Sequence, residues 1–224
     1  MAKRDRKATP APAPKVAPQL PRRQAQRSFP ASTFEEPLEF ARSIFRIGGG
    51  QPIRRLTLFD QLGKSPESSG SRQLITNASK YGLTRGHTGA ENIELTLEGR
   101  KAVDEQVSAR EQARTRIALA IEGIELFKTL YDKTVNNKLP SKAVLFDTVR
   151  SIDVSADHAA EAVDTFIVNL SFVGLLKTLS GAERVLPIDM HLDQLPSATR
   201  LRARHKVTAL LSYKICNVHS DLVK

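Results

Sequence analysis

Residues 65–97, SPESSGSRQLITNASKYGLTRGHTGAENIELTL, combine the signals of one helix with those of two strands that follow it. Ser65 before Pro66 is a helix start signal, because serine caps free backbone N–H groups and proline suits the first helical position. Apolar side chains then recur at helical spacing as far as Gly82. They are Leu74, Ile75, Ala78 and Tyr81. The stretch therefore predicts a helix that buries one face.

The residues around this helix complete a recognisable order of elements. After it, 83–85 and 93–97 predict two short strands, with a tip at 87–90 between them. Before it, 35–47 predict a first helix that ends at the glycines 48–50, and Pro52 opens a second helix that ends at Gly63. Three helices followed by a hairpin are the order of a winged helix-turn-helix unit.

The same order is predicted a second time further along the chain. One long helix is expected over 98–136, with a bend near Gly123. Leu139-Pro140 opens the next helix, and Ser155 caps another. Residues 174–176 and 184–188 then predict a second hairpin. The expected fold class is mainly α with short β-hairpins, arranged as a tandem winged helix-turn-helix.

An internal comparison supports the repeat. A shift of 92 positions lays Gly82-Leu83 on Gly174-Leu175, and Gly89-Ala90-Glu91 on Gly181-Ala182-Glu183. The same shift lays Leu74-Ile75 on Phe166-Ile167. A shared glycine exit and a shared tip at one separation favour two copies of one unit.

With these elements, the chain resembles the uncharacterised prokaryotic tandem winged-helix domains that lie N-terminal to effector domains. The resemblance covers roughly residues 34–190 and rests on 65–83, 95–99 and 155–176. It implies two winged-helix units and no catalytic residues. Members of that group usually continue beyond the second wing, so the short basic segment at the end of this chain suggests a truncated member.

Charge separates the ends of the chain from its body. The net charge is +10. Residues 1–28 carry eight Lys/Arg and one Asp, and 197–224 carry six and one, which leaves 29–196 with 20 positive and 22 negative residues. The predicted organisation is a disordered basic Ala/Pro-rich tail (1–32), a first unit (33–104), a second unit with a long connecting helix (105–190) and a basic C-terminal tail (191–224).

The outward face of the third helix of the first unit is the candidate DNA-reading surface. Arginine pairs bidentately with guanine, and Gln or Asn with adenine, while a wing contacts the backbone. The candidate DNA-binding residues are Ser69, Arg72, Gln73, Thr76, Asn77, Lys80, Arg85, His87, Arg54 and Arg55. An ordinary solvated helix face is also polar, so this alternative stays open.

The residues of the second unit indicate a role other than DNA binding. Its corresponding helix is expected to present Asp157, His158, Glu161, Asp164 and Thr165. Carboxylates facing phosphates are repelled, so this unit is expected to bind a protein partner or to self-associate.

Signals for catalysis, cofactors and metals are missing from the sequence. Cys216 is the single cysteine, and glycines 48–50 lack the lysine of a phosphate loop. A strand would place Asp189 and His191 on one face, which is a weak signal for a metal site. Such side chains are more often solvated than bound to a metal. No apolar run has the length of a membrane span. A cytoplasmic protein without a cofactor is expected.

Two functions therefore remain open. The first is a non-enzymatic DNA-binding regulator, in which the first winged helix contacts duplex DNA and the second unit mediates assembly. The alternative is a protein-interaction or sensor module of a larger system, such as a defence system, whose folded body does not bind DNA. A third hypothesis, a basic protein associated with the nucleoid or the ribosome, is supported by the tails alone. Fold alone does not separate these functions.

Overall fold

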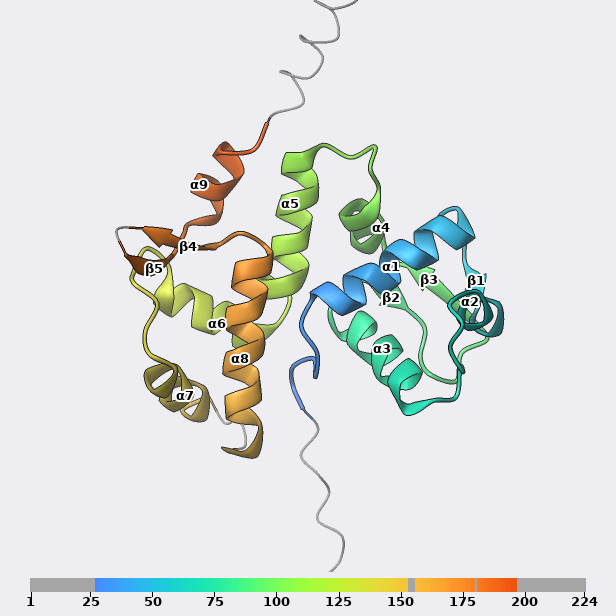
Figure 1. The fold of residues 1–224 in the computed structure, drawn as a ribbon, viewed down its shortest axis with the longest axis horizontal. Helices are drawn as coiled ribbons and strands as arrows, with labels where there is room; N and C mark the ends of the chain where they lie inside the picture. The colour runs from blue at the N-terminus through green and yellow to red at the C-terminus, as the bar shows by residue number, and fades with distance from the viewer. Residues whose placement is uncertain (1–26, 153–155, 180, 197–224) are drawn as a thin grey trace, which may run out of the picture.

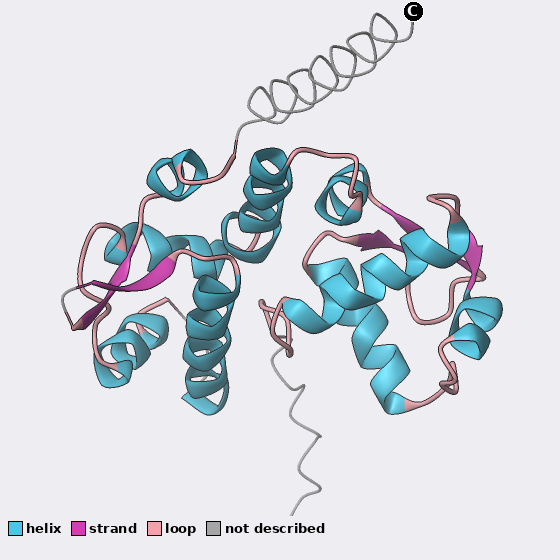
Figure 2. Cartoon of the chain, turned by 45° about the horizontal axis from the view of Figure 1, so that its top comes forward, coloured by secondary structure: helices cyan, strands magenta, loops and turns pink. Residues whose placement is uncertain are grey.

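The computed structural model describes residues 27–152, 156–179 and 181–196. These residues form a mainly helical protein with small antiparallel sheets (Figures 1 and 2). The predicted class, mainly α with short hairpins, is confirmed. The expected tails at 1–26 and 197–224, the Ser155 cap and Cys216 lie outside the described residues.

The first half of the chain alternates helices with very short strands. In chain order its elements are α1 (Glu35–Gly48), β1 (Ile53–Arg54), α2 (Arg55–Gln61), α3 (Ser69–Lys80), β2 (Thr84–Arg85), β3 (Asn92–Leu95) and α4 (Leu97–Val103). The three strands form one antiparallel sheet in the order β1-β3-β2. Ile53 pairs with Ile93, and Thr84 with Leu95. The sheet therefore joins the start of α2 to the hairpin that follows α3.

The second half follows a similar order. Its elements are α5 (Ala109–Ile117), the π-helical turn η1 (Ala118–Glu122), α6 (Glu125–Thr134), α7 (Lys142–Arg150), α8 (Ala156–Phe172), β4 (Leu176–Leu179), β5 (Ala182–Val185) and α9 (Ile188–Asp193). A single antiparallel bridge joins Lys138 to Arg184 on β5, in the position that β1 has in the first half. From α6 to α9 the succession of helices and strands matches that from α1 to α4.

Backbone hydrogen bonds repeat at the separation of 92 residues. At the end of α3 the Leu83 N–H donates to the Ala78 carbonyl, and at the end of α8 the Leu175 N–H donates to Leu170, each at 2.9 Å. Gly82 and Gly174 leave the two helices with φ of 72° and 79°, a left-handed conformation that favours glycine. The repeat seen in the sequence therefore corresponds to two helix endings with the same geometry.

Both halves contribute to one apolar core. Phe34 and Tyr81 from the first half lie in the same cluster as Phe127 and Phe166 from the second. The Phe34 and Tyr81 rings meet edge to face with centroids 5.1 Å apart. A smaller cluster under the three-stranded sheet contains the stacked pair Phe40 and Phe59. Because buried aromatics contribute strongly to core stability, the shared cluster holds the halves together.

Several predicted boundaries are wrong. The single helix expected over 98–136 is divided among α4, α5, η1 and α6, because Ser108 caps a new helix at α5 and Ile124 has an extended backbone. Ser68, not Ser65, caps α3 through the Ser71 N–H. The prolines at 52 and 140 precede β1 and α7 rather than opening helices.

Both predicted tails include residues that belong to the folded part of the chain. Phe29 is 1% exposed, and its ring lies 6.2 Å from that of Phe127. Residues 27–34, called the strap below, therefore belong to the folded body. At the other end α9 extends to Asp193, and Leu192 is buried. No helix among the described residues is long and apolar enough to cross a bilayer.

Candidate nucleic-acid interface

Four of the predicted DNA-binding residues share the exposed face of α3. Ser69, Arg72, Gln73 and Thr76 are all exposed, while Leu74, Ile75 and Ala78 on the opposite face are buried in the core. The Thr76 hydroxyl donates to the Arg72 carbonyl at 2.8 Å. The helix therefore offers a polar face of one arginine, one glutamine and two hydroxyl groups to solvent.

Asn77 does not lie on that face, which corrects the prediction. It is 2% exposed, and its Oδ1 accepts the Ala31 N–H at 3.0 Å while its Nδ2 donates to Ser32 Oγ at 2.8 Å. Its amide thus holds the strap. The prediction failed because the strap was assigned to a disordered tail, so no partner for Asn77 was expected.

Lys80 also binds the strap. Its Nζ donates to the Arg27 carbonyl at 2.8 Å and to the Phe29 carbonyl at 3.1 Å. Burial, and to a smaller extent the Arg27 charge, lowers the pKa of Lys80. Lys80 therefore stabilises the start of the folded body, and its ammonium is not aligned with the exposed α3 face.

Arg55 and Arg72 converge on one carboxylate. Arg55 Nη1 lies 2.8 Å from Glu67 Oε1, and Arg72 Nη2 lies 2.7 Å from Glu67 Oε2. Hydrogen bonds from Arg72 and Arg55 lower the pKa of Glu67. The side chain of Arg55 is only 13% exposed and also donates to the Pro66 carbonyl. Arg55 thus fixes the loop before α3, while the Arg72 side chain is 56% exposed.

The sheet and the hairpin tip carry the remaining candidates. Arg54 pairs with Glu91 at 2.8 Å, and Arg85 approaches Glu94 at 3.9 Å, with both arginine side chains more than 70% exposed. Exposed ion pairs of this kind contribute little free energy, so a phosphate can replace the carboxylate. His87 is exposed, and its Nδ1 accepts the Gly89 N–H at 3.1 Å within the tip.

The corresponding face of α8 differs in chemistry. At the separation of 92 residues, Arg72 corresponds to Asp164, Thr76 to Val168 and Gln73 to the buried Thr165, while Phe172 takes the place of Lys80 beside that face. Val168 is 44% exposed and Phe172 37% exposed. The sequence predicts acidic residues on this face, but it does not predict that apolar side chains are exposed there. That exposure follows only from which side of α8 faces away from the core.

The charged residues predicted for α8 are placed as follows. Glu161 pairs with Arg27 at 2.8 Å, and Asp164 with Lys142 at 2.6 Å. His158 Nδ1 lies 3.9 Å from Glu161. Thr165 is 5% exposed and faces the core, which corrects its predicted exposure. The side chain of Asp157 lies outside the described residues.

No metal centre is formed by the described residues. Within 27–152, 156–179 and 181–196, no three His, Cys, Asp or Glu side chains gather in a way that could hold an ion. Asp189 and His191 lie on α9, not on a strand as predicted. Burial, and secondarily the charge of Lys177, lowers the pKa of His191. Its ring lies against Gly174, where an added Cβ would come within 2.6 Å of Cε1, so His191 packs from α9 against the turn before β4.

Comparison with protein-family models, curated proteins and solved structures gave no match to this chain. In the first half, the predicted residues that remain exposed lie on α3, on the sheet and at the hairpin tip. We call this surface, formed by Ser69, Arg72, Gln73, Thr76, Arg54, Arg85 and His87, the α3 surface.

Proposed function

We propose that the protein is a non-enzymatic DNA-binding regulator in which residues 33–104 act as a winged helix-turn-helix unit. The order α1-β1-α2-α3-β2-β3 and the strand order β1-β3-β2 support this assignment. In such a unit the third helix enters the major groove and the hairpin contacts the backbone. Residues 105–193 are proposed to be a second unit of the same kind, supported by the matching order from α6 to α9.

The contrast between α3 and α8 at corresponding positions carries the proposal. The exposed face of α3 holds Arg72, Gln73 and Thr76 and no carboxylate; Glu67, which pairs with Arg72, lies in the loop before the helix. Exposed Arg54 and Arg85 lie on the sheet, each near one glutamate. Arginine and glutamine are side chains that read base edges, and flanking arginines suit phosphates. α8 instead presents Asp164 and exposed apolar side chains, which suit protein contact better than DNA.

Base readout is tested with the double variant Arg72→Ala/Gln73→Ala. A preferred duplex is first selected from a random pool with the unsubstituted protein. The variant is expected to lose about tenfold or more in affinity for this duplex, and little for a scrambled one. Arg54→Ala/Arg85→Ala is the matched control: it should weaken both duplexes alike and reduce the salt dependence of binding by about one to two counterions. Equal losses on both duplexes for Arg72→Ala/Gln73→Ala would remove the base-reading role.

A second role, protein contact through α8, is favoured by the exposed Val168 and Phe172. Apolar side chains grouped on one helix face are typical of interaction surfaces. Val168→Lys should reduce self-association in sedimentation velocity over a concentration series, whereas Thr57→Lys, at an exposed position of α2, should not. If neither change affects association and the body does not bind DNA, the sensor or interaction function with a different partner gains support.

A further inference from the structure

Three charged side chains meet at the start of α3, around the carboxylate of Glu67. Glu67 lies in the loop before the helix and directly precedes the cap residue Ser68. Its two oxygens contact different arginines: Oε1 lies 2.8 Å from Arg55 Nη1, and Oε2 lies 2.7 Å from Arg72 Nη2. One carboxylate thus joins the first residue of α2 to an exposed residue of α3.

The loop that carries Glu67 is fixed by two further contacts. Arg55 Nη1 also donates to the Pro66 carbonyl at 3.2 Å. Ser71, which is 3% exposed, donates its hydroxyl to the Ser65 carbonyl at 2.6 Å. Because one contact comes from α2 and the other from α3, the Glu67 carboxylate has a set position relative to both helices.

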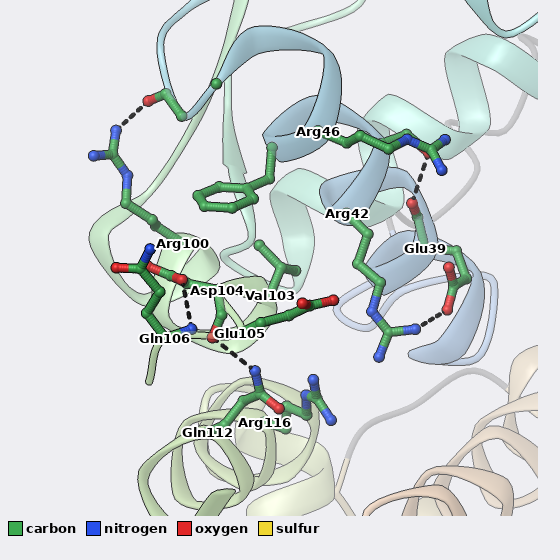
Figure 3. Close-up of a pocket in the computed structure, with 14 residues that line it drawn as sticks. Glu39, Arg42, Arg46, Arg100, Val103, Asp104, Glu105, Gln106, Gln112 and Arg116 are labelled. Atoms are coloured by element: carbon green, nitrogen blue, oxygen red, sulfur yellow. Dashed lines mark hydrogen bonds and ion pairs between the residues drawn. The ribbon is translucent and has the colours of Figure 1, made fainter. Parts of the chain in front are cut away.

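The arginines in the groove between α1, α4 and α5 do not converge in this way (Figure 3). Arg42 pairs with Glu39, whereas Arg100 and Arg116 donate to backbone carbonyls. In Figure 3 the guanidinium groups of Arg46, Arg100 and Arg116 point apart. The sharing of one carboxylate by two arginines is therefore a feature of the loop before α3 and not of this groove.

The two arginines that share Glu67 differ in what they can still bind. The Arg55 side chain is 13% exposed, whereas that of Arg72 is 56% exposed. Arg72 donates to Glu67 from Nη2, and a guanidinium carries five N–H donors, so further donors of Arg72 can meet a base edge. A guanidinium that a carboxylate already holds loses less entropy when it binds. Arg55 is thus the anchor, and Arg72 is the group presented to solvent.

Glu67 also places a negative charge near the proposed DNA surface, but its two partners compensate that charge. Two guanidinium groups and one carboxylate give the cluster a net charge of +1. Hydrogen bonds from Arg72 and then from Arg55 lower the pKa of Glu67, so the carboxylate is ionised at neutral pH. At the corresponding position of α8 the residue is Asp164. The shared fold therefore does not require an arginine at this position.

We propose that Glu67 is a positioning residue that orients Arg72 toward one guanine of the DNA site. This inference rests on the proposed function and adds to it the base that is read and the residue that prepares the reading. Arg72 is the fourth residue of α3, and residues near the start of a recognition helix contact base edges. Guanine presents its O6 and N7 acceptors in the major groove, where they match a guanidinium fork.

The first experiment tests the contact in the full chain without DNA. A carbon-detected NMR titration follows the Glu67 carboxyl, whose pKa should lie below the ordinary value of 4.5. Arg72→Ala should raise this pKa, because the first-ranked hydrogen bond is lost. Gln73→Ala, at the next exposed position, is the matched control and should leave it unchanged. If Arg72→Ala does not move the pKa, Glu67 does not hold Arg72 and the proposal is overturned.

The second experiment separates position from charge on the selected duplex and on a scrambled one. Glu67→Asp keeps the charge but shortens the side chain, so it should lower the preference for the selected duplex by about three- to tenfold and leave scrambled binding unchanged. Glu67→Gln should lower the preference similarly and strengthen scrambled binding, because a negative charge is lost. Glu91→Gln, in the exposed pair with Arg54, is the matched control and should strengthen both duplexes alike. The Glu67 side chain is 56% exposed, so both of its substitutions leave the core intact.

The outcomes distinguish this inference from the proposed function. The preference lost in the Glu67 variants should be confined to the base pair whose preference Arg72→Ala abolishes, and the preferred base there should be guanine. If Arg72→Ala abolishes a preference that both Glu67 variants keep, or if the base is not guanine, the proposed function stands and the positioning role is wrong. If Arg72→Ala itself keeps the preference, base reading by Arg72 fails and the role of Glu67 fails with it.

Discussion

Asn77 and Asn169 hold opposite sides of the same segment of chain. Asn77 Oδ1 accepts the Ala31 N–H at 3.0 Å, and Asn169 Oδ1 accepts the Phe34 N–H at 2.8 Å. The two residues are 92 positions apart, the separation of the internal repeat, and both are at most 2% exposed. The strap is therefore fixed between α3 and α8 by equivalent positions of the two halves.

Removing either amide should destabilise the protein. Asn77→Ala and Asn169→Ala each leave a backbone N–H of the strap without its acceptor, which costs about 1–3 kcal/mol. Their combined loss should be smaller than the sum, because both act on one segment. Denaturant unfolding measures these differences. Gln73→Ala, exposed on the same helix as Asn77, is the control and should change stability by less than about 0.5 kcal/mol.

The strap also contributes apolar contacts. Phe29→Ala removes a ring that is 1% exposed and packs near Phe127, and it should lower the free energy of unfolding by about 3–5 kcal/mol. Ser28→Ala, at the exposed neighbouring position, should have little effect in the same thermal or denaturant melts. Equal stability of the two variants would mean that residues before Thr33 do not belong to the folded body.

Two helical glycines should respond in opposite directions to alanine. At Gly99 an added Cβ would lie 2.0 Å from the Leu83 carbonyl oxygen, whereas at Gly70 no atom lies within 4 Å. Gly70→Ala should stabilise α3 by about 0.5–1 kcal/mol through helix propensity. Gly99→Ala should destabilise by several kcal/mol, roughly 2–4, because α4 must move away from Leu83. Calorimetric melting of both variants measures the difference. A stabilising Gly99→Ala would contradict the close packing of α4 on the Leu83 backbone.

The half-buried His191 should make stability sensitive to mild acid. Burial lowers its pKa in the folded state below the ordinary value of 6.5, so the unfolded chain takes up the proton first as the pH falls. This contribution to stability is complete above pH 6.5 and is lost as the pH falls from 6.5 toward the folded-state pKa. Urea unfolding at several pH values between 7.5 and 5 should show a smaller decline for His191→Gln than for the unsubstituted protein. Parallel curves for the two proteins would exclude His191 as the source.

The elements that the sequence predicted best are those with strong local signals. Leu74 and Ile75 at helical spacing placed α3, and Gly82 and Gly174 placed the two helix endings. These features depend on neighbours within a few residues, which a sequence displays directly. The same locality explains the correct expectation of two hairpins after α3 and α8.

The features that the sequence did not predict depend on distant partners. Phe29 lies among prolines and arginines that are typical of a tail. It is nevertheless buried, because it packs near Phe127, which is far along the chain. Asn77 and Lys80 share the polar pattern of Arg72 and Thr76, and only the position of the strap separates them. No local motif reveals that α1, α4 and α5 surround one groove.

The most direct test of DNA binding by the folded body compares residues 1–224 with residues 27–196 by fluorescence anisotropy on duplex DNA. The shorter protein keeps the strap but loses all of the excess positive charge, because residues 27–196 hold 21 Lys/Arg and 22 Asp/Glu. At about 150 mM salt, where non-specific phosphate contacts are weakened, the proposed function predicts that 27–196 still binds its selected duplex and that Arg72→Ala/Gln73→Ala abolishes the preference. Loss of all binding with the two ends would contradict it and would leave the body as a protein-interaction module.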